Sequence, residues 1–140
     1  MIRQRNPRRS GAAATEAVFC IPIVLLLTFG TLDICNTIFL KETITVAAYE
    51  GARVGSKRLA TRADAEAMVR TILTARGVVE QRPNDFQITV SPANFSTLRA
   101  LDPITVWVNV PVSGYVPFTR DLLGLRRVGA TVRMVREFDQ

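Results

Sequence analysis

Residues 12–32 read AAATEAVFCIPIVLLLTFGTL, an apolar stretch that contains one acidic residue, Glu16. At about 1.5 Å of rise per residue, a helix of this length measures roughly 31 Å, the thickness of the hydrocarbon core of a bilayer. We therefore expect residues 12–33 to form a transmembrane helix in contact with membrane lipid. A cleaved secretory signal peptide fits less well, because its apolar core is shorter and its small residues follow that core. Here Gly11 and three alanines precede it.

The segment before this stretch is basic. Residues 1–11 contain no acidic residue and four arginines: Arg3, Arg5, Arg8 and Arg9. Basic flanks stay on the cytoplasmic side of a span, so we predict a cytoplasmic leader at 1–11 and a periplasmic location for the chain after residue 33. The leader supplies four of the six net positive charges of the chain, so the charge does not indicate a nucleic-acid partner.

The residues after the span are expected to continue the same helix. Residues 34–59 lack proline, and Leu40, Ile44 and Ala48 begin an apolar stripe at helical spacing. Small residues recur at every fourth position, which allows close packing of a helix: Ala47, Gly51 and Gly55, and Ala48 and Ala52. The sequence leaves open whether this face packs on a sheet of the same chain or on another subunit. Pro22 lacks a backbone donor and is expected to loosen the helix near Val18.

Residues 60–140 are long enough for one small core and predict an α+β periplasmic head. Thr61 and Asp64 form a capping box before a helical pattern that stops at Gly77. Period-two patterns follow at 86–90, 104–112 and 128–134, and they predict a three- to four-stranded antiparallel sheet covered by the exposed half of the long helix. The alternation places Trp107 opposite the valines. The aromatic residues Trp107, Tyr115 and Phe118 could form a contact patch or close the core, and we expect them to close the core.

The chain offers few groups for catalysis, and we expect no enzyme, no cofactor, no metal and no small-molecule substrate. Histidine is absent, and no phosphate loop or nucleophile elbow occurs. Cys20 and Cys35 lie 15 residues apart, roughly 22 Å along one helix, so they cannot form a disulfide within one chain. Cys35 of two copies could still cross-link in an oxidising compartment. A hydrolase using Asp102 or Asp121 lacks a recognisable acid–base set.

Glu16 is a functional candidate because an ionisable group inside a span is costly. The alternative is that Glu16 simply lies near the helix start, where the dipole and the interface tolerate an anion. Its context decides: Gly11, four residues, Glu16 and an apolar run together resemble the prepilin pattern. Pro22 after Glu16, Phe29-Gly30 followed by Asp33, the segment AAYEGAR at 47–53 and the closing ATVRMVREF resemble TadE-like proteins of tight-adherence (Flp) pili.

The resemblance implies a minor pilin or pseudopilin anchored in the bacterial inner membrane. It implies that a prepilin peptidase cuts between Gly11 and Ala12, and that Glu16 then faces the new α-amino group of its own chain or of a neighbour. The residue after the acid is Ala17, where pilins of this system usually have an aromatic residue. The resemblance therefore leaves open that the chain stays uncut and serves only as a membrane-anchored component.

The sequence thus predicts a non-enzymatic structural or assembly component of a tight-adherence pilus, with other pilin-like subunits and pilus assembly proteins as partners. These contacts would use the 12–33 helix and the small-residue face at 47–55. The alternative is a membrane-anchored periplasmic binding module unrelated to pili, in which Glu16 has no role.

Overall fold

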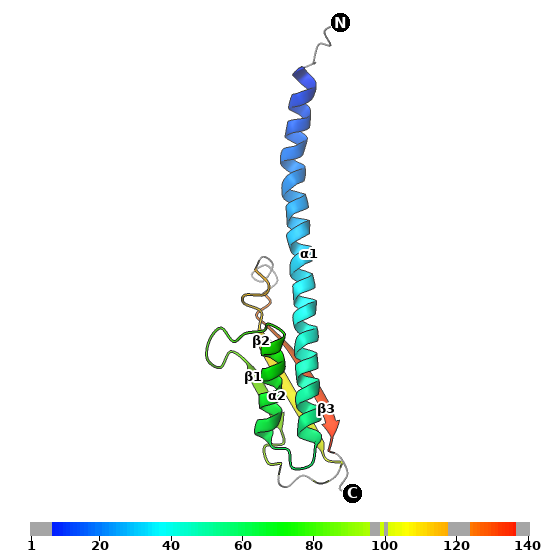
Figure 1. Ribbon diagram of the computed structural model, residues 1–140. Helices are drawn as coiled ribbons and strands as arrows, with labels where there is room; N and C mark the ends of the chain where they lie inside the picture. The colour runs from blue at the N-terminus through cyan, green and yellow to red at the C-terminus, as the bar shows by residue number, and fades with distance from the viewer. Residues whose placement is uncertain (1–6, 96–98, 100, 118–123, 137–140) are drawn as a thin grey trace.

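The computed structural model describes residues 7–95, 99, 101–117 and 124–136, apart from the side chains of residues 7–10 and 12. Within these residues the chain forms two helices and then one antiparallel sheet of three strands in the order β1-β2-β3, as Figure 1 shows. The elements are α1 (Pro7–Ser56), α2 (Arg62–Ala75), β1 (Gln87–Ser91), β2 (Pro103–Pro111) and β3 (Arg127–Val135). The predicted α+β fold, with its long N-terminal helix and second helix, is confirmed.

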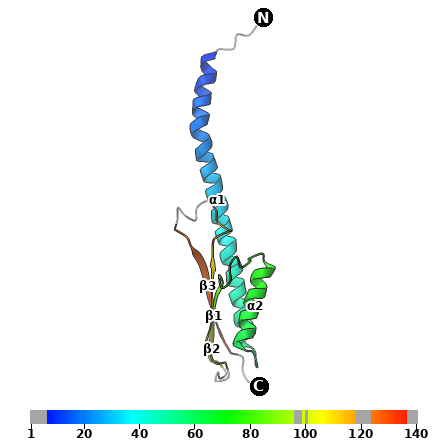
Figure 2. The same cartoon turned by 90° about the vertical axis from the view of Figure 1, so that its left-hand side faces the viewer.

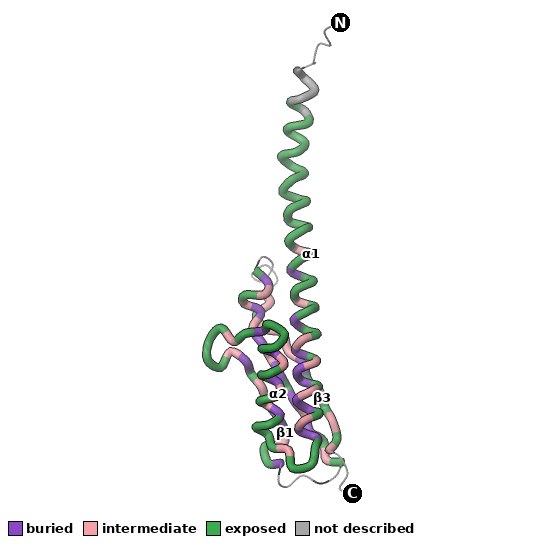
Figure 3. Tube along the Cα trace, in the orientation of Figure 1, coloured by how far each residue is buried: buried purple, intermediate pink, exposed green. Residues whose placement is uncertain are grey.

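Helix α1 is a single helix of 50 residues, exposed along its N-terminal part and partly buried along its C-terminal part. Its N-terminal part projects from the head, and its C-terminal part lies in the head with one side covered (Figure 3). The predicted stripe is buried there, from Leu40 and Ile44 to Ala52, whereas Lys41 and Tyr49 on other sides of the helix are exposed. The helix ends at Ser56, whose hydroxyl donates to the Arg53 carbonyl at 2.9 Å.

Helix α2 begins at the capping box that the sequence predicts. The Thr61 hydroxyl accepts a hydrogen bond from the Asp64 backbone N–H at 3.2 Å, and the Asp64 carboxylate accepts one from the Thr61 N–H at 2.9 Å. Hydrogen bonds from the Thr61 side chain and then its backbone hold the pKa of Asp64 below its ordinary value. After the helix, Gly77 has a φ of +77°, a conformation that favours glycine.

The sheet has one covered face and one open face. Ile104, Val106 and Val108 of the central strand β2 point toward the helices and are fully buried. Figure 2 shows α1 and α2 on the same side of the sheet, and neither of these described helices lies on its other side. Trp107 belongs to the open face and is 37% exposed, so the expectation that it closes the core is wrong. Successive side chains of a strand alternate between faces, and the neighbours of Trp107 already occupy the core side.

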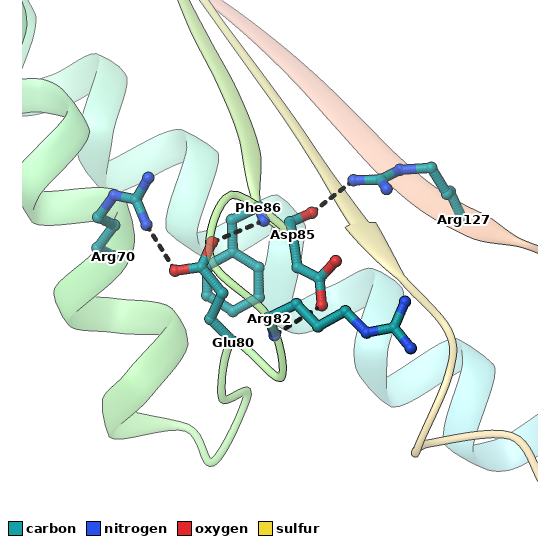
Figure 4. Close-up of polar contacts among 6 residues, drawn as sticks. All are labelled: Arg70, Glu80, Arg82, Asp85, Phe86 and Arg127. Carbon is teal, nitrogen blue, oxygen red and sulfur yellow. Dashed lines mark hydrogen bonds and ion pairs between the residues drawn. The ribbon is translucent and has the colours of Figure 1, made fainter.

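The connection between α2 and β1 is held by polar contacts to both layers (Figure 4). Glu80 pairs with Arg70 of α2 at 3.1 Å, and its other carboxylate oxygen accepts from the Phe86 N–H at 3.1 Å. Across the sheet, Arg127 of β3 donates to the Asp85 carbonyl at 2.6 Å. The Tyr115 hydroxyl accepts a hydrogen bond from the Val79 N–H at 2.9 Å. Phe118, the third aromatic residue expected in the core, lies outside the described residues. These contacts join α2, the connection after it and β3 within the head.

Candidate functional site

The uncovered half of α1 is the main candidate site. Of the described helices, α1 is the one that is long and apolar enough to cross a membrane, and only 6% of its most apolar window is buried in the head. A core helix of a soluble protein would be mostly covered, so the exposure of this half makes it a candidate surface for contact with a membrane or another molecule. The exposed large apolar residues of this half are Val18, Phe19, Ile21, Ile23, Val24, Leu25, Leu26, Leu27, Phe29, Leu32, Ile34, Ile38 and Phe39.

Glu16 lies near the N-terminal end of this surface and is exposed. It follows Gly11 by five residues, which is roughly 7.5 Å along the helix axis. Gly11 is also exposed, and its missing Cβ would meet no other atom within 4 Å. Thr15, beside Glu16, donates its hydroxyl back to the Gly11 carbonyl at 3.3 Å. Glu16 thus lies on a regular helix, and no part of the described head covers it, so another molecule can contact it.

The predicted topology residues are only partly described. Arg3 and Arg5 lie outside the described residues, and so do the side chains of Arg8, Arg9 and Ala12, whose backbone belongs to α1. The orientation of the leader and the cleavage position between Gly11 and Ala12 therefore remain predictions.

Pro22 lies inside α1, and the helix continues through it. Proline has no N–H, so the Val18 carbonyl lacks its usual helical donor at this point. Pro22 is exposed, as are the residues on both sides of it. A break of this kind is tolerated in a span when a neighbouring helix covers it, which makes Pro22 part of the candidate assembly surface.

Asp33 was not among the predicted site residues, yet it is buried to 1% exposure where α1 meets the head. Its neighbours Leu32 and Ile34 are both more than half exposed. Asp33 is engaged in a polar contact, and its carbonyl accepts from the Thr37 hydroxyl at 2.8 Å. The one sequence signal for it was its place after Phe29-Gly30. Its burial shows that the head reaches α1 at the level where the predicted span ends.

The small-residue face of α1 is occupied inside the chain. Ala47, Ala48, Gly51, Ala52 and Gly55 are all buried. A Cβ at Gly51 would overlap Val69 Cγ2 of α2, and one at Gly55 would touch Ala65 Cβ at 3.4 Å. Of the two alternatives left open by the sequence, the structure supports packing within the same chain. The expectation of subunit contacts through residues 47–55 is corrected, because α2 and the sheet already cover this face.

The acidic residues of the head have structural contacts. Asp102 accepts a hydrogen bond from the Arg99 N–H at 2.7 Å, within the turn that precedes β2. Asp121 lies outside the described residues. Among the described residues, no group of three or more acidic or cysteine side chains is placed to hold a metal ion. Cys20 and Cys35 are free thiols on exposed positions of α1.

Comparison with models of protein families gives a match to part of the chain. Residues 11–53 match the family model described as TadE-like protein, a segment that lies wholly within α1 and includes Glu16, Pro22 and most of the small-residue face. The expected TadE-like resemblance is thereby confirmed for this segment. No curated protein and no solved structure matches the chain.

Proposed function

Because residues 11–53 are TadE-like, we propose that this protein is a minor pilin or pseudopilin of a tight-adherence pilus. In this role it is a non-enzymatic assembly component. It crosses the inner membrane once, with residues 1–11 in the cytoplasm and the α+β head in the periplasm. Its partners are membrane lipid, other pilin-like subunits and pilus assembly proteins.

The observation that carries this proposal is the uncovered apolar half of α1 with Glu16 near its start. This half belongs to the same continuous helix that packs in the head, so no linker separates the anchor from the head. A flexible tether would be enough for an anchored binding module. A continuous helix that carries an acid at a set distance from the head supports a role in which each subunit is placed in register with the next.

Glu16 gains a function if the leader is removed by a prepilin peptidase. A cut between Gly11 and Ala12 makes the Ala12 nitrogen a free amine four residues before Glu16. Residues four apart lie on the same side of a helix, so the carboxylate reaches its own amine or that of an adjacent subunit at the same depth. Opposite charges within a few ångströms favour both ionised forms in a medium of low dielectric constant. An acid left without its amine would therefore draw a second subunit into register.

The N-terminus of the protein from its native membrane tests this proposal. We expect mass spectrometry of the purified chain to give Ala12 as the first residue, with the leader absent. Gly11→Ala places a methyl group at the cut and is expected to leave the leader attached. The position has room for this methyl group, so the substitution should not disturb the helix itself. Glu42→Gln, on the head half of α1, serves as a control that leaves processing unchanged. An intact Met1 in the wild-type protein would favour the anchored binding module instead.

A further inference from the structure

The open face of the sheet carries a polar platform around the single tryptophan of the chain. The strand register places its residues in three rows across β1, β2 and β3. The middle row is Thr89, Trp107 and Thr131. The flanking rows are Gln87, Asn109 and Gly129 on one side, and Ser91, Thr105 and Arg133 on the other. Neither helix of the described chain packs on this face (Figure 2).

Small side chains leave the Trp107 indole accessible. Both residues paired directly with it are threonines, and Gly129, on its diagonal, has no side chain. Neighbouring strands lie about 4.8 Å apart and rows about 7 Å apart, so hydroxyl and amide groups surround the indole ring. A ligand stacked on the ring could form hydrogen bonds to these groups. Trp107 is 37% exposed although it lies on the central strand.

The charged side chains on the open face of the three strands are all positive. The outward-facing residues of the three strands include Arg127 and Arg133 and no acidic residue. The Arg127 guanidinium lies across β2, where it donates to the Asn109 carbonyl at 3.0 Å. A ligand that meets this platform is therefore expected to carry carboxylate or similar anionic groups, which pair well with guanidinium.

Two polar atoms on the same face lack partners. Within the described residues, Asn109 Oδ1 and Arg127 Nε are buried side-chain atoms without a hydrogen bond. Buried polar atoms normally have one. One of these atoms is an acceptor and the other a donor, so the described chain leaves part of the hydrogen-bonding capacity beneath this face unused.

We propose that this platform binds an acidic polysaccharide. The apolar face of a sugar ring would stack on Trp107, its hydroxyl groups would bond to threonine and amide side chains, and its carboxylates would pair with Arg133 and Arg127. A protein partner fits less well, because protein interfaces are centred on clustered apolar residues and here one aromatic residue is ringed by polar groups. The inference does not depend on the proposed role in a pilus.

Trp107 provides the measurement, because its fluorescence reports on this face alone. The full chain in detergent micelles is titrated with an oligomer of galacturonic acid and, for comparison, with a neutral glucose oligomer of equal length. We expect a saturable change in fluorescence with the acidic oligomer and binding at least about tenfold weaker with the neutral one. Raising the salt concentration should reduce that difference, since exposed charges are screened.

Two variants separate stacking from charge. Trp107→Ala, followed by calorimetry, should weaken binding of the acidic oligomer by about tenfold or more, whereas Tyr49→Ala removes an exposed aromatic residue elsewhere and should leave binding unchanged. Arg133→Gln keeps the indole and should remove most of the preference for the acidic oligomer.

Three results would overturn the inference. One is no saturable binding of either oligomer, and another is binding that Trp107→Ala does not weaken. The third is a concentration-dependent shift of Trp107 fluorescence without saccharide, which would show that a second copy of the chain occupies the platform.

Discussion

Replacing Glu16 by glutamine is expected to abolish pilus assembly while the protein still enters the membrane. Glutamine has nearly the same size and keeps the helix, but it removes the charge that would meet the Ala12 amine. Leaving one member of a desolvated ion pair without its partner costs about 3–5 kcal/mol, which corresponds to a loss of roughly two to three and a half orders of magnitude in association. Electron microscopy of surface fibres and immunoblots of membrane fractions measure the two quantities separately.

Glu42→Gln is the matched control for this experiment. Glu42 lies on the same helix and is exposed, but it belongs to the half that runs along the head. This variant should assemble normally. Normal fibres with Glu16→Gln would contradict the assigned role of the acid and would leave a tethered head as the remaining explanation.

Gly51→Ala is expected to destabilise the head by about 1–3 kcal/mol, the cost of overpacking a close-packed core. The new methyl group would overlap Val69 Cγ2 and lie 3.2 Å from the Ala65 carbonyl oxygen, so α1 and α2 would have to move apart. Alanine favours a helix over glycine by up to about 1 kcal/mol, which offsets only part of this cost. Denaturant unfolding of the full chain in micelles, followed by Trp107 fluorescence, measures the change.

Gly55→Ala is the control one turn further along the same face. Its methyl group would meet Ala65 Cβ at 3.4 Å and Phe95 Cε2 at 3.5 Å, which are ordinary contacts. This variant is expected to be neutral or to gain up to about 1 kcal/mol from helix propensity. Equal effects of the two substitutions would contradict the packing described for the small-residue face.

Periodicity predicted most of the fold. The stripe from Leu40 to Ala52 and the alternation in β2 each follow from one element with one buried side, and both were confirmed. The capping box at Thr61 was also predicted, because it depends on residues three positions apart. Local patterns of this kind are visible in a sequence because each repeats within a few residues.

Asp33 and the small-residue face depended on contacts that the sequence does not show, whereas the position of Trp107 was visible in its own strand. Trp107 was expected in the core although its alternation placed it on the other face, and the alternation was right. Asp33 was overlooked because the residues on either side of it, Leu32 and Ile34, are exposed members of the apolar run, so the local pattern does not mark a buried acid. The small-residue face was compatible with either a sheet or a second subunit, since close approach of backbones requires the same residues in both cases.

The position of the candidate site could be predicted from the sequence, but the molecule that contacts it could not. The apolar run and Glu16 stand out in the sequence, and the structure shows that the head leaves them uncovered. What meets this surface depends on molecules outside the chain. The family match over residues 11–53 supports the proposed place in a tight-adherence pilus, and that proposal requires α1 to cross the membrane in a defined position.

The two native cysteines give the most direct test of that arrangement. Both are exposed on α1, roughly 22 Å apart, and the account places Cys20 in lipid and Cys35 just outside it in the periplasm. Cells without their outer membrane are treated with a maleimide that cannot cross a bilayer, using Cys20→Ser and Cys35→Ser variants. We predict that the chain retaining Cys35 is labelled at once and that the chain retaining Cys20 is labelled only after detergent is added. Labelling of Cys20 in intact membranes, or of Cys35 only after permeabilisation, would contradict the account.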